Sequence, residues 1–321
     1  MIVRIVVAVV LVYLIPSMLL MFFDVFNSEQ ALPDDNGEIY LESTVIKDPV
    51  PEFPDFKIDV ITENGCCKMP LEEYVLCVTL AEMPADFELE ALKAQAVVAR
   101  TYTLRRMEGP KHETGAVCTD SACCQAYTSI ASYLQSGGTQ ASVDKVRIAV
   151  EATAGQVLTY QGAYIEATYF SCSGGKTEDA QAVWGSDVPY LQSVESPGEE
   201  MATHFTDTVS FSKDEFLNKL GLESDAVRIG KILYTDGGGV LSIEVCGRVF
   251  SGTEMRGKLG LRSTAFVITA AGEKVTVTTK GFGHRVGMSQ YGAEAMAVQG
   301  TSYDKILFHY YQGTELTVLS G

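Results

Sequence analysis

Apolar side chains recur at helical spacing in the first half of the chain. One face of the segment 71–81 carries them three or four positions apart, which predicts an amphipathic helix: Leu71, Tyr74, Val75 and Val78. Pro84 disfavours the helical conformation of the residue before it, so we expect this helix to end near Glu82. Two further helices are predicted, over 89–106, which is rich in alanine, and over 142–152.

The second half of the chain predicts short strands. The segment 156–170 is rich in strand-forming residues, and apolar runs follow at 228–234, 240–245 and 275–278, with a helix near 213–220 between them. No repeat of fixed period is visible. We therefore predict an α+β fold, with mixed helices and short strands in one large domain over residues 67–321.

The N-terminal segment is uniformly apolar. Residues 5–23 form a run of nineteen residues without a charge, preceded by Arg4. At about 1.5 Å per residue this run just crosses a hydrocarbon core of about 30 Å. We predict a transmembrane helix over 1–23 in the cell membrane, single-pass, with the N-terminus cytoplasmic and the rest of the chain extracytoplasmic. A cleaved signal peptide is the alternative, although the run ends in Met-Phe-Phe-Asp rather than in small residues.

An acidic segment follows the apolar run. Residues 24–59 hold ten acidic residues, two lysines and four prolines. This composition repels itself and buries little apolar surface. We predict an extended stalk over residues 24–66.

The charge of the whole chain excludes one class of partner. The 321 residues include 24 Lys and Arg against 41 Asp and Glu, a formal net charge of -17. Binding to a nucleic acid backbone requires clustered cations that release counterions, and no arginine-rich run is present. We expect no nucleic acid partner.

Four potential metal ligands occur within thirteen residues. They are one histidine and three cysteines: His112, Cys118, Cys123 and Cys124. A Cys3His set suits zinc, and four protein ligands leave no open position, which predicts a structural Zn2+. A disulfide between Cys118 and Cys123 or Cys124 is the alternative, because an extracytoplasmic location permits one.

Glu82 is the residue most indicative of chemistry. It stands in the sequence Ala-Glu-Met-Pro, at a predicted helix end and between apolar neighbours. Partial desolvation there would raise the pKa of its carboxyl group, as a general acid near neutral pH requires. An exposed glutamate at the end of a helix is the alternative that spacing alone leaves open.

Four segments resemble a known family. They are LEEYVLCVTLAEMPADFELEALKAQAVVARTY at 71–102, YFSCSGGKTE at 169–178, VWG at 183–185 and GFGHRVGMSQYGA at 281–293. Together they resemble the stage II sporulation protein D (SpoIID) family, which includes the amidase-enhancer domains of cell-wall proteins. The resemblance runs from about residue 67 to the C-terminus. The predicted anchor and stalk also suit this family.

The resemblance implies a lytic transglycosylase that acts on peptidoglycan during sporulation engulfment. Such an enzyme cleaves between N-acetylmuramic acid and N-acetylglucosamine in strands stripped of stem peptides. The family's catalytic glutamate falls on Glu82. One carboxylate suffices because the sugar's own C6 hydroxyl attacks the anomeric carbon and closes a 1,6-anhydro ring, whereas ordinary glycosidases need two carboxylates.

Motif position and chemistry suggest the substrate-binding residues. They lie on the second helix and in the two later motifs: Gln95, Arg100, Tyr102, Tyr169, Ser171, Ser173, Lys176, His284, Gln290 and Tyr291. Three of these have alternatives. Arg100 would equally pair with a stalk carboxylate, Tyr102 would equally pack in the core, and His284 would equally be a structural histidine. Arg285 stands where the family usually carries glycine.

The family also implies the metal and the partners. Its loop carries His-x5-Cys-x4-His-Cys around zinc, and Cys123 replaces the second histidine here. The implied partners are peptidoglycan glycan strands, a peptide-stripping amidase and a membrane scaffold of the engulfment machinery. Two other functions stay open: a non-catalytic wall-binding module that recruits or stimulates an amidase, and a metalloenzyme that uses the Cys/His cluster.

Overall fold

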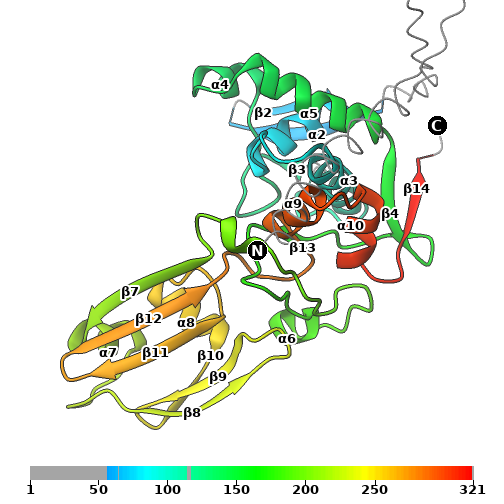
Figure 1. The fold of residues 1–321 in the computed structure, drawn as a ribbon. Helices are drawn as coiled ribbons and strands as arrows, with labels where there is room; N and C mark the ends of the chain where they lie inside the picture. The colour runs from blue at the N-terminus through cyan, green and yellow to red at the C-terminus, as the bar shows by residue number, and fades with distance from the viewer. Residues whose placement is uncertain (1–55, 64, 114–116, 320–321) are drawn as a thin grey trace, which may run out of the picture. The chain divides into compact units, whose positions relative to one another are not determined.

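A computed structural model of the chain describes residues 56–63, 65–113 and 117–319 (Figure 1). The predicted anchor over 1–23 and the stalk up to residue 55 lie outside the described residues. Within the described ranges, no helix is both long and apolar enough to cross a membrane. The mixed α and β composition that the sequence predicts is confirmed.

The first described strand lies inside the segment predicted to be stalk. Strand β1 (Lys57–Thr62) pairs antiparallel with β2 (Gly65–Pro70) and parallel with β3 (Val117–Cys118). Ile58 and Val60 of β1 are buried in the main core. The stalk boundary at residue 66 is therefore too late, because the acidic composition hid the apolar alternation of β1.

Helix α3 (Leu89–Glu108) is the centre of the first core. It contacts four other helices: α2 (Leu71–Glu82), α5 (Gln140–Ala152), α9 (Gln290–Val298) and α10 (Tyr303–Tyr310). Small α4 (Ile130–Gln135) precedes α5, and a sheet in the order β14-β4-β5 covers the end of α3: β4 (Gln156–Tyr160), β5 (Ala163–Tyr164) and β14 (Glu315–Val318). Most of α3 is buried, so its alanines allow close helix packing.

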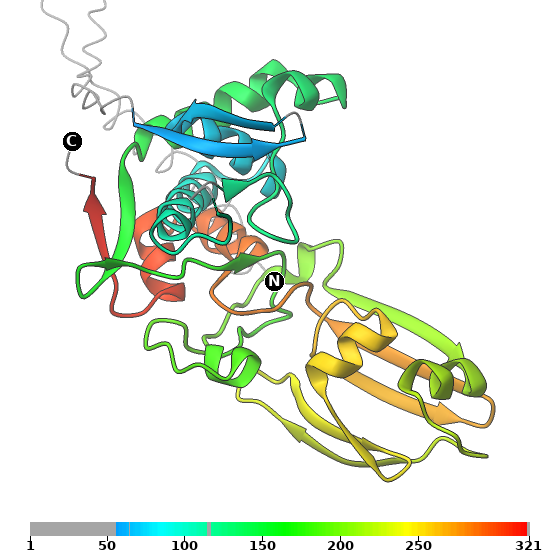
Figure 2. The same ribbon diagram turned by 180° about the vertical axis from the view of Figure 1, so that it is seen from behind.

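A second core is formed by two three-stranded sheets together with two helices. One sheet has the order β11-β12-β7 and the other β10-β9-β8. Their elements are β7 (Thr206–Ser212), α7 (Lys213–Leu220), β8 (Ile229–Tyr234), β9 (Val240–Val245), β10 (Arg248–Ser251), α8 (Gly252–Leu259), β11 (Phe266–Ala271) and β12 (Lys274–Lys280). Phe216, Phe250 and Val277 are among its buried side chains. Figures 1 and 2 show these strands grouped together, away from the helices of the first core.

The two chain segments that connect the second core (residues 206–280) to the first lie next to each other. The amide of Gly281, directly after β12, donates to the carbonyl of Phe205, directly before β7, at 2.9 Å. Next to this junction, β6 (Tyr169–Phe170) pairs in parallel with β13 (Met288–Ser289). Short α6 (Ala180–Trp184) and the 3-10 turn Glu199–Met201 lie in the connection that precedes β7. The 206–280 unit is thus an insertion between two neighbouring strands.

Candidate functional site

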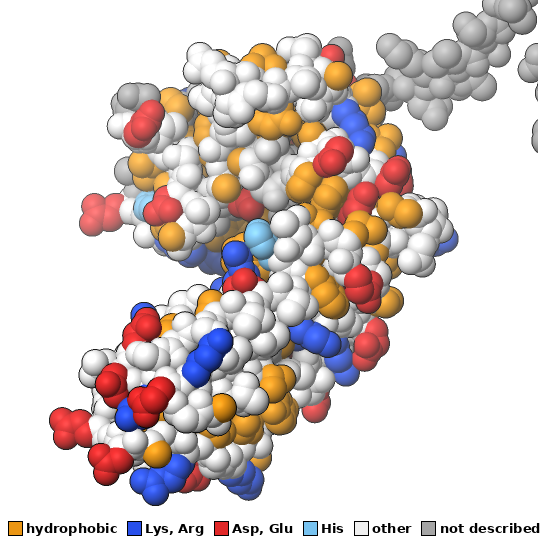
Figure 3. Space-filling model, turned by 60° about the vertical axis from the view of Figure 1, so that its left-hand side comes forward, with side chains coloured by type: hydrophobic (Ala, Val, Ile, Leu, Met, Phe, Trp, Pro, Cys, Tyr) orange, Lys and Arg blue, Asp and Glu red, His pale blue; other side chains and the backbone are white. Residues whose placement is uncertain are grey.

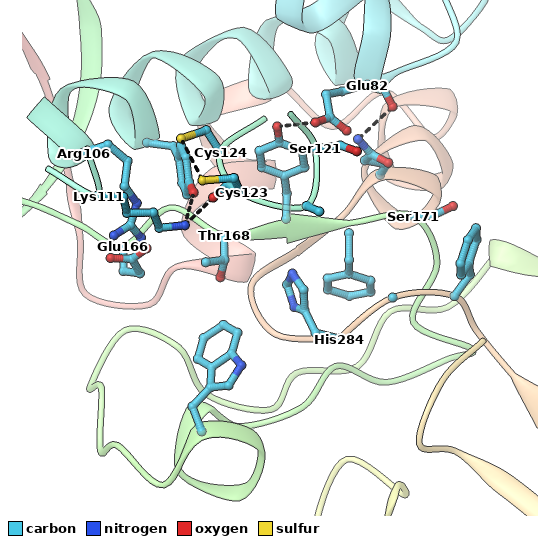
Figure 4. Close-up of a pocket in the computed structure, with 18 residues that line it drawn as sticks. Glu82, Arg106, Lys111, Ser121, Cys123, Cys124, Glu166, Thr168, Ser171 and His284 are labelled. Atoms are coloured by element: carbon cyan, nitrogen blue, oxygen red, sulfur yellow. Dashed lines mark hydrogen bonds and ion pairs between the residues drawn. The ribbon is translucent and has the colours of Figure 1, made fainter. Parts of the chain in front are cut away.

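A cleft of about 890 Å³ lies beside the junction of β6 and β13. Its walls come from the end of α2, the end of α3, Lys111, the segment 121–124, the segment 166–171, α6 and the loop 282–290 (Figure 4). Six of the residues proposed from the sequence for catalysis or substrate binding line it: Glu82, Tyr102, Tyr169, Ser171, His284 and Gln290. Two of the predicted metal ligands, Cys123 and Cys124, line it as well. The volume is within the usual range of ligand pockets.

Glu82 is the last residue of α2, and the turn before Pro84 aims its carboxyl group into the cleft. Met83 is extended and closes the helix, as Pro84 requires. One carboxyl oxygen, Oε1, accepts hydrogen bonds from the Ala126 amide at 2.7 Å and from the Tyr169 hydroxyl at 3.0 Å. Burial raises the pKa of Glu82, and these two hydrogen bonds offset part of that rise. The negative end of the α2 dipole also disfavours the ionised form.

Two glutamines hold the turn that carries Glu82. Gln290, the first residue of α9, donates from Nε2 to the backbone carbonyl of Glu82 at 2.9 Å. The same nitrogen lies 3.5 Å from Oε1 of Gln95, which is fully buried on α3. Gln95 therefore lies beneath the cleft and supports Gln290, instead of facing a substrate as the sequence suggested.

An aromatic wall faces the cleft on the side of the loop 282–290. The ring of His284 lies edge-on to Phe170 with centroids 5.6 Å apart and tilted against Trp184 at 5.4 Å. Its Nδ1 accepts from the Val286 amide at 3.2 Å. Burial, and secondarily Arg256, lowers the pKa of His284 to about 4, so the imidazole is neutral at physiological pH. Trp184, the only tryptophan of the chain, is 44% exposed here.

A basic wall lies on another side of the cleft, and sequence reasoning missed it. Arg106 stacks over the ring of Tyr102, with Cζ 4.7 Å from the centroid, and forms an ion pair with Glu166. Lys111 donates to the hydroxyl of Tyr102 at 3.3 Å and to the carbonyl of Cys123. Figure 4 shows Arg106, Lys111 and Glu166 close together on one side of the pocket. Trp184 was also missed, although its motif was noted.

The predicted metal ligands converge on one point beside the cleft. The ligand atoms of His112, Cys118, Cys123 and Cys124 all lie within 4.8 Å of one another. Nε2 of His112 is 3.7 Å from Sγ of Cys123 and 3.5 Å from Sγ of Cys124, and the two sulfurs are 3.9 Å apart. Tetrahedral zinc bonds imply about 3.6 Å for N to S and about 3.8 Å for S to S.

The geometry therefore fits a metal ion held by four protein ligands. No disulfide forms at this cluster or elsewhere, because all eight cysteines are free. The alternative disulfide of Cys118 with Cys123 or Cys124 is not present. Cys118 is buried in β3, which ties the cluster to the first core.

Comparison with known proteins agrees with the motifs. The family model "Stage II sporulation protein" matches residues 62–160. Stage II sporulation protein D of Bacillus subtilis (strain 168) is 44% identical over 259 residues, which cover 78% of this chain and 75% of that protein. The chain belongs to the stage II sporulation protein D family.

Two further relatives extend the comparison. The stage II sporulation protein D of Bacillus amyloliquefaciens is 42% identical, over 78% of this chain and 74% of that protein. A protein named "Amidase enhancer" in Bacillus subtilis (strain 168) is 33% identical over 74% of this chain but only 39% of its own length. The relatives' names place the family in sporulation and in a cell-wall context.

Besides Gln95, four residues proposed for substrate binding in this family member do not line the cleft. Arg100 is fully buried, and its Nε donates to Glu72 Oε1 at 2.8 Å. Its charge is therefore balanced within the fold by a residue of α2, not by a stalk carboxylate. Three more lie in other contacts: Ser173 is buried against Glu199, Lys176 pairs with Glu195 at 3.3 Å, and Tyr291 packs edge-on against Phe87.

The buried carboxylate of Glu199 organises the YFSCSGGKTE motif. It accepts hydrogen bonds from the amides of Ser173 and Gly174, at 2.7 and 2.8 Å, and from the Ser196 hydroxyl at 2.6 Å. The thiol of Cys172 also donates to it at 3.1 Å, so this cysteine serves as a hydrogen-bond donor to the buried Glu199. Burial and the neighbouring carboxylate raise the pKa of Cys172, so the thiol keeps its proton. Residues 172–178 of the motif thus shape the loop behind Ser171, and none of them lines the cleft.

Arg285 stands where the resemblance implies a glycine, and its backbone has a glycine-like φ of +69°. The buried guanidinium forms an ion pair with Glu178 at 3.0 Å. It also donates to the carbonyls of Ser173, Lys176 and Gly237 at 2.7, 2.8 and 2.7 Å. Because Gly237 belongs to the inserted unit, Arg285 connects that unit to the loop that carries His284.

Proposed function

We propose that the protein is a peptidoglycan lytic transglycosylase with Glu82 as its catalytic residue. The supporting observation is a cleft whose described wall offers one unpaired carboxyl group, on Glu82, with a raised pKa. The other carboxylate that lines the cleft, Glu166, is paired with Arg106. A hydrolytic glycosidase needs a second free carboxylate, whereas intramolecular attack by a sugar hydroxyl needs a single acid that then acts as a base.

The chemistry follows from the position of Glu82. Its protonated carboxyl group donates to the glycosidic oxygen while the bond from that oxygen to C1 of N-acetylmuramic acid breaks. The resulting carboxylate accepts the proton of the C6 hydroxyl as the C6 oxygen bonds to C1, which yields a 1,6-anhydro end. Because Tyr169 and Ala126 both bond Oε1, they fix the carboxyl plane and leave Oε2 to the substrate.

The cluster of His112, Cys118, Cys123 and Cys124 would hold a structural Zn2+. Such an ion would fix His112, next to Lys111, and Cys124, two residues before the Ala126 amide that bonds Glu82. With four protein ligands the ion has no open position for substrate, so the reaction steps belong to the protein side chains.

The cellular setting is part of the proposal. We propose that an anchor over 1–23 holds the catalytic domain outside the cytoplasm at the cell membrane, within reach of stripped glycan strands. A peptide-stripping amidase and a membrane scaffold of engulfment are the proposed partners. The relative named "Amidase enhancer" supports a second candidate function, in which the protein binds the wall and stimulates an amidase without cleaving glycans.

The test is mass spectrometry of products from peptide-free glycan strands incubated with the zinc-loaded protein. We expect 1,6-anhydro-muramic ends, lost by at least about a hundredfold in Glu82→Gln and retained in Glu200→Gln, which changes an exposed glutamate. Strands that still carry stem peptides should be poor substrates. Reducing ends would mean that water is the nucleophile and would refute the mechanism. No products from a folded sample would favour the amidase-stimulating function.

A further inference from the structure

The basic wall of the cleft is unusual for a chain with a net charge of -17. Figure 3 shows Lys and Arg side chains gathered beside a histidine on the hollowed face of the molecule. Within the described lining of the cleft, the cations are Arg106 and Lys111. Surface charge in an acidic protein is expected to be mostly negative, so cations at the mouth of a cleft point to an anionic ligand.

Lys111 is the cation that a ligand can use. Arg106 is already neutralised by Glu166, with side chains that are 18% and 27% exposed. Lys111 contacts only neutral acceptors among the described residues, the hydroxyl of Tyr102 and the carbonyl of Cys123. An ammonium has three donors, so one remains for a ligand. Tyr102 accepts from Lys111, and among the described residues its own hydroxyl proton has no acceptor, so it can donate to a ligand beside Lys111.

We propose that Lys111, with the Tyr102 hydroxyl, binds a carboxylate of the glycan: the lactyl carboxylate that a muramoyl residue exposes once its stem peptide has been removed. The identity of the glycan rests on the proposed function. Removal of the stem peptide converts a neutral amide into a carboxylate with a full negative charge, and the ammonium of Lys111 distinguishes these two groups. The charge thus selects stripped strands, in addition to any steric exclusion of the peptide.

The experiment measures binding, so that it does not depend on cleavage. Calorimetric titrations use the full chain carrying Glu82→Gln and a MurNAc-GlcNAc oligosaccharide, either with free lactyl carboxylates or with these groups converted to N-methylamides. We expect the acid to bind about fivefold more tightly than the amide at low salt, a preference that weakens at high salt. Lys111→Met should bring the ratio close to one, and Lys111→Arg should restore it.

Three controls make the result decisive. Lys231→Met removes an exposed lysine of β8 and should keep the fivefold preference. Zinc content must be unchanged in Lys111→Met, because His112 is adjacent. Equal affinity for acid and amide in the Glu82→Gln parent, or an unchanged preference in Lys111→Met, would overturn the inference. Preferential binding of the acid without cleavage by the wild-type protein would instead overturn the transglycosylase proposal and leave the carboxylate site standing.

Discussion

Replacing Arg285 with glycine tests whether the buried ion pair outweighs the strained backbone. Arg285 and Glu178 are 2% and 1% exposed, and Arg285 has a φ of +69°. The resemblance implies glycine at this position, and glycine adopts this φ without steric cost. If the backbone strain were the larger effect, Arg285→Gly would stabilise the protein.

The free energies of the two effects predict that Arg285→Gly destabilises the protein. Relief of a left-handed residue recovers about 1 kcal/mol. Removal of one partner from a buried ion pair costs about 3–5 kcal/mol, because the carboxylate of Glu178 stays buried without its counter-charge. We expect Arg285→Gly to lower the free energy of unfolding by about 2–4 kcal/mol. A second change, Glu178→Gln, removes the uncompensated charge while its amide oxygen still accepts from Thr235 and Gly239, so it should recover part of the loss.

Urea denaturation of the zinc-loaded protein at pH 7 measures this difference. The matched control is Arg248→Gly, an exposed arginine on β10, where only the loss of strand propensity and of a contact with Phe250 is expected. An Arg285→Gly protein as stable as the parent would refute the reasoning, since the ion pair would then contribute nothing beyond the strain it accompanies.

Three further predictions concern protons and metal. The pKa of Glu82 is raised in the folded state, so the folded protein binds more protons than the unfolded one, and stability falls as pH rises from about 4.5 through the raised pKa; denaturation at several pH values should show this slope reduced in Glu82→Gln. For His284, with its pKa lowered to about 4, the folded state binds fewer protons, so its contribution to stability rises with pH between about 4 and 6.5, and its NMR resonances should not titrate between pH 5.5 and 8. Chelation of zinc, or Cys118→Ser, should lower the melting temperature in calorimetry, and an unchanged melting temperature would argue against a structural metal.

Local patterns predicted much of the helical core. The helix predicted over 71–81 is Leu71–Glu82, and the one predicted over 89–106 is Leu89–Glu108. Helix Gly252–Leu259 went unrecognised: it contains two glycines and has a short apolar face. Strand β1 was assigned to the stalk, because two buried side chains carry less weight in the sequence than the acidic residues and prolines around them.

The residues of the site could be predicted where the local sequence alone indicates their chemical role. Glu82 and the four metal ligands belong to this class, since a proline-forced helix end and the spacing of soft ligands are visible in the sequence. Arg100 and Ser173 were misjudged because motif position does not say which way a side chain points. Lys111 and Trp184 were missed because their role depends on neighbours that the fold brings together from distant parts of the chain.

The meeting of Phe205 and Gly281 makes the 206–280 unit a closed module in topological terms. Its two ends are joined by a hydrogen bond of 2.9 Å, and it has a core of its own. When the two ends of an inserted unit lie together, a change in the length of that unit, or its replacement, costs little closure entropy. The cleft and the module can therefore vary independently in evolution, with the carbonyl of Gly237 on Arg285 as one of the points where a change in the module reaches the cleft loop.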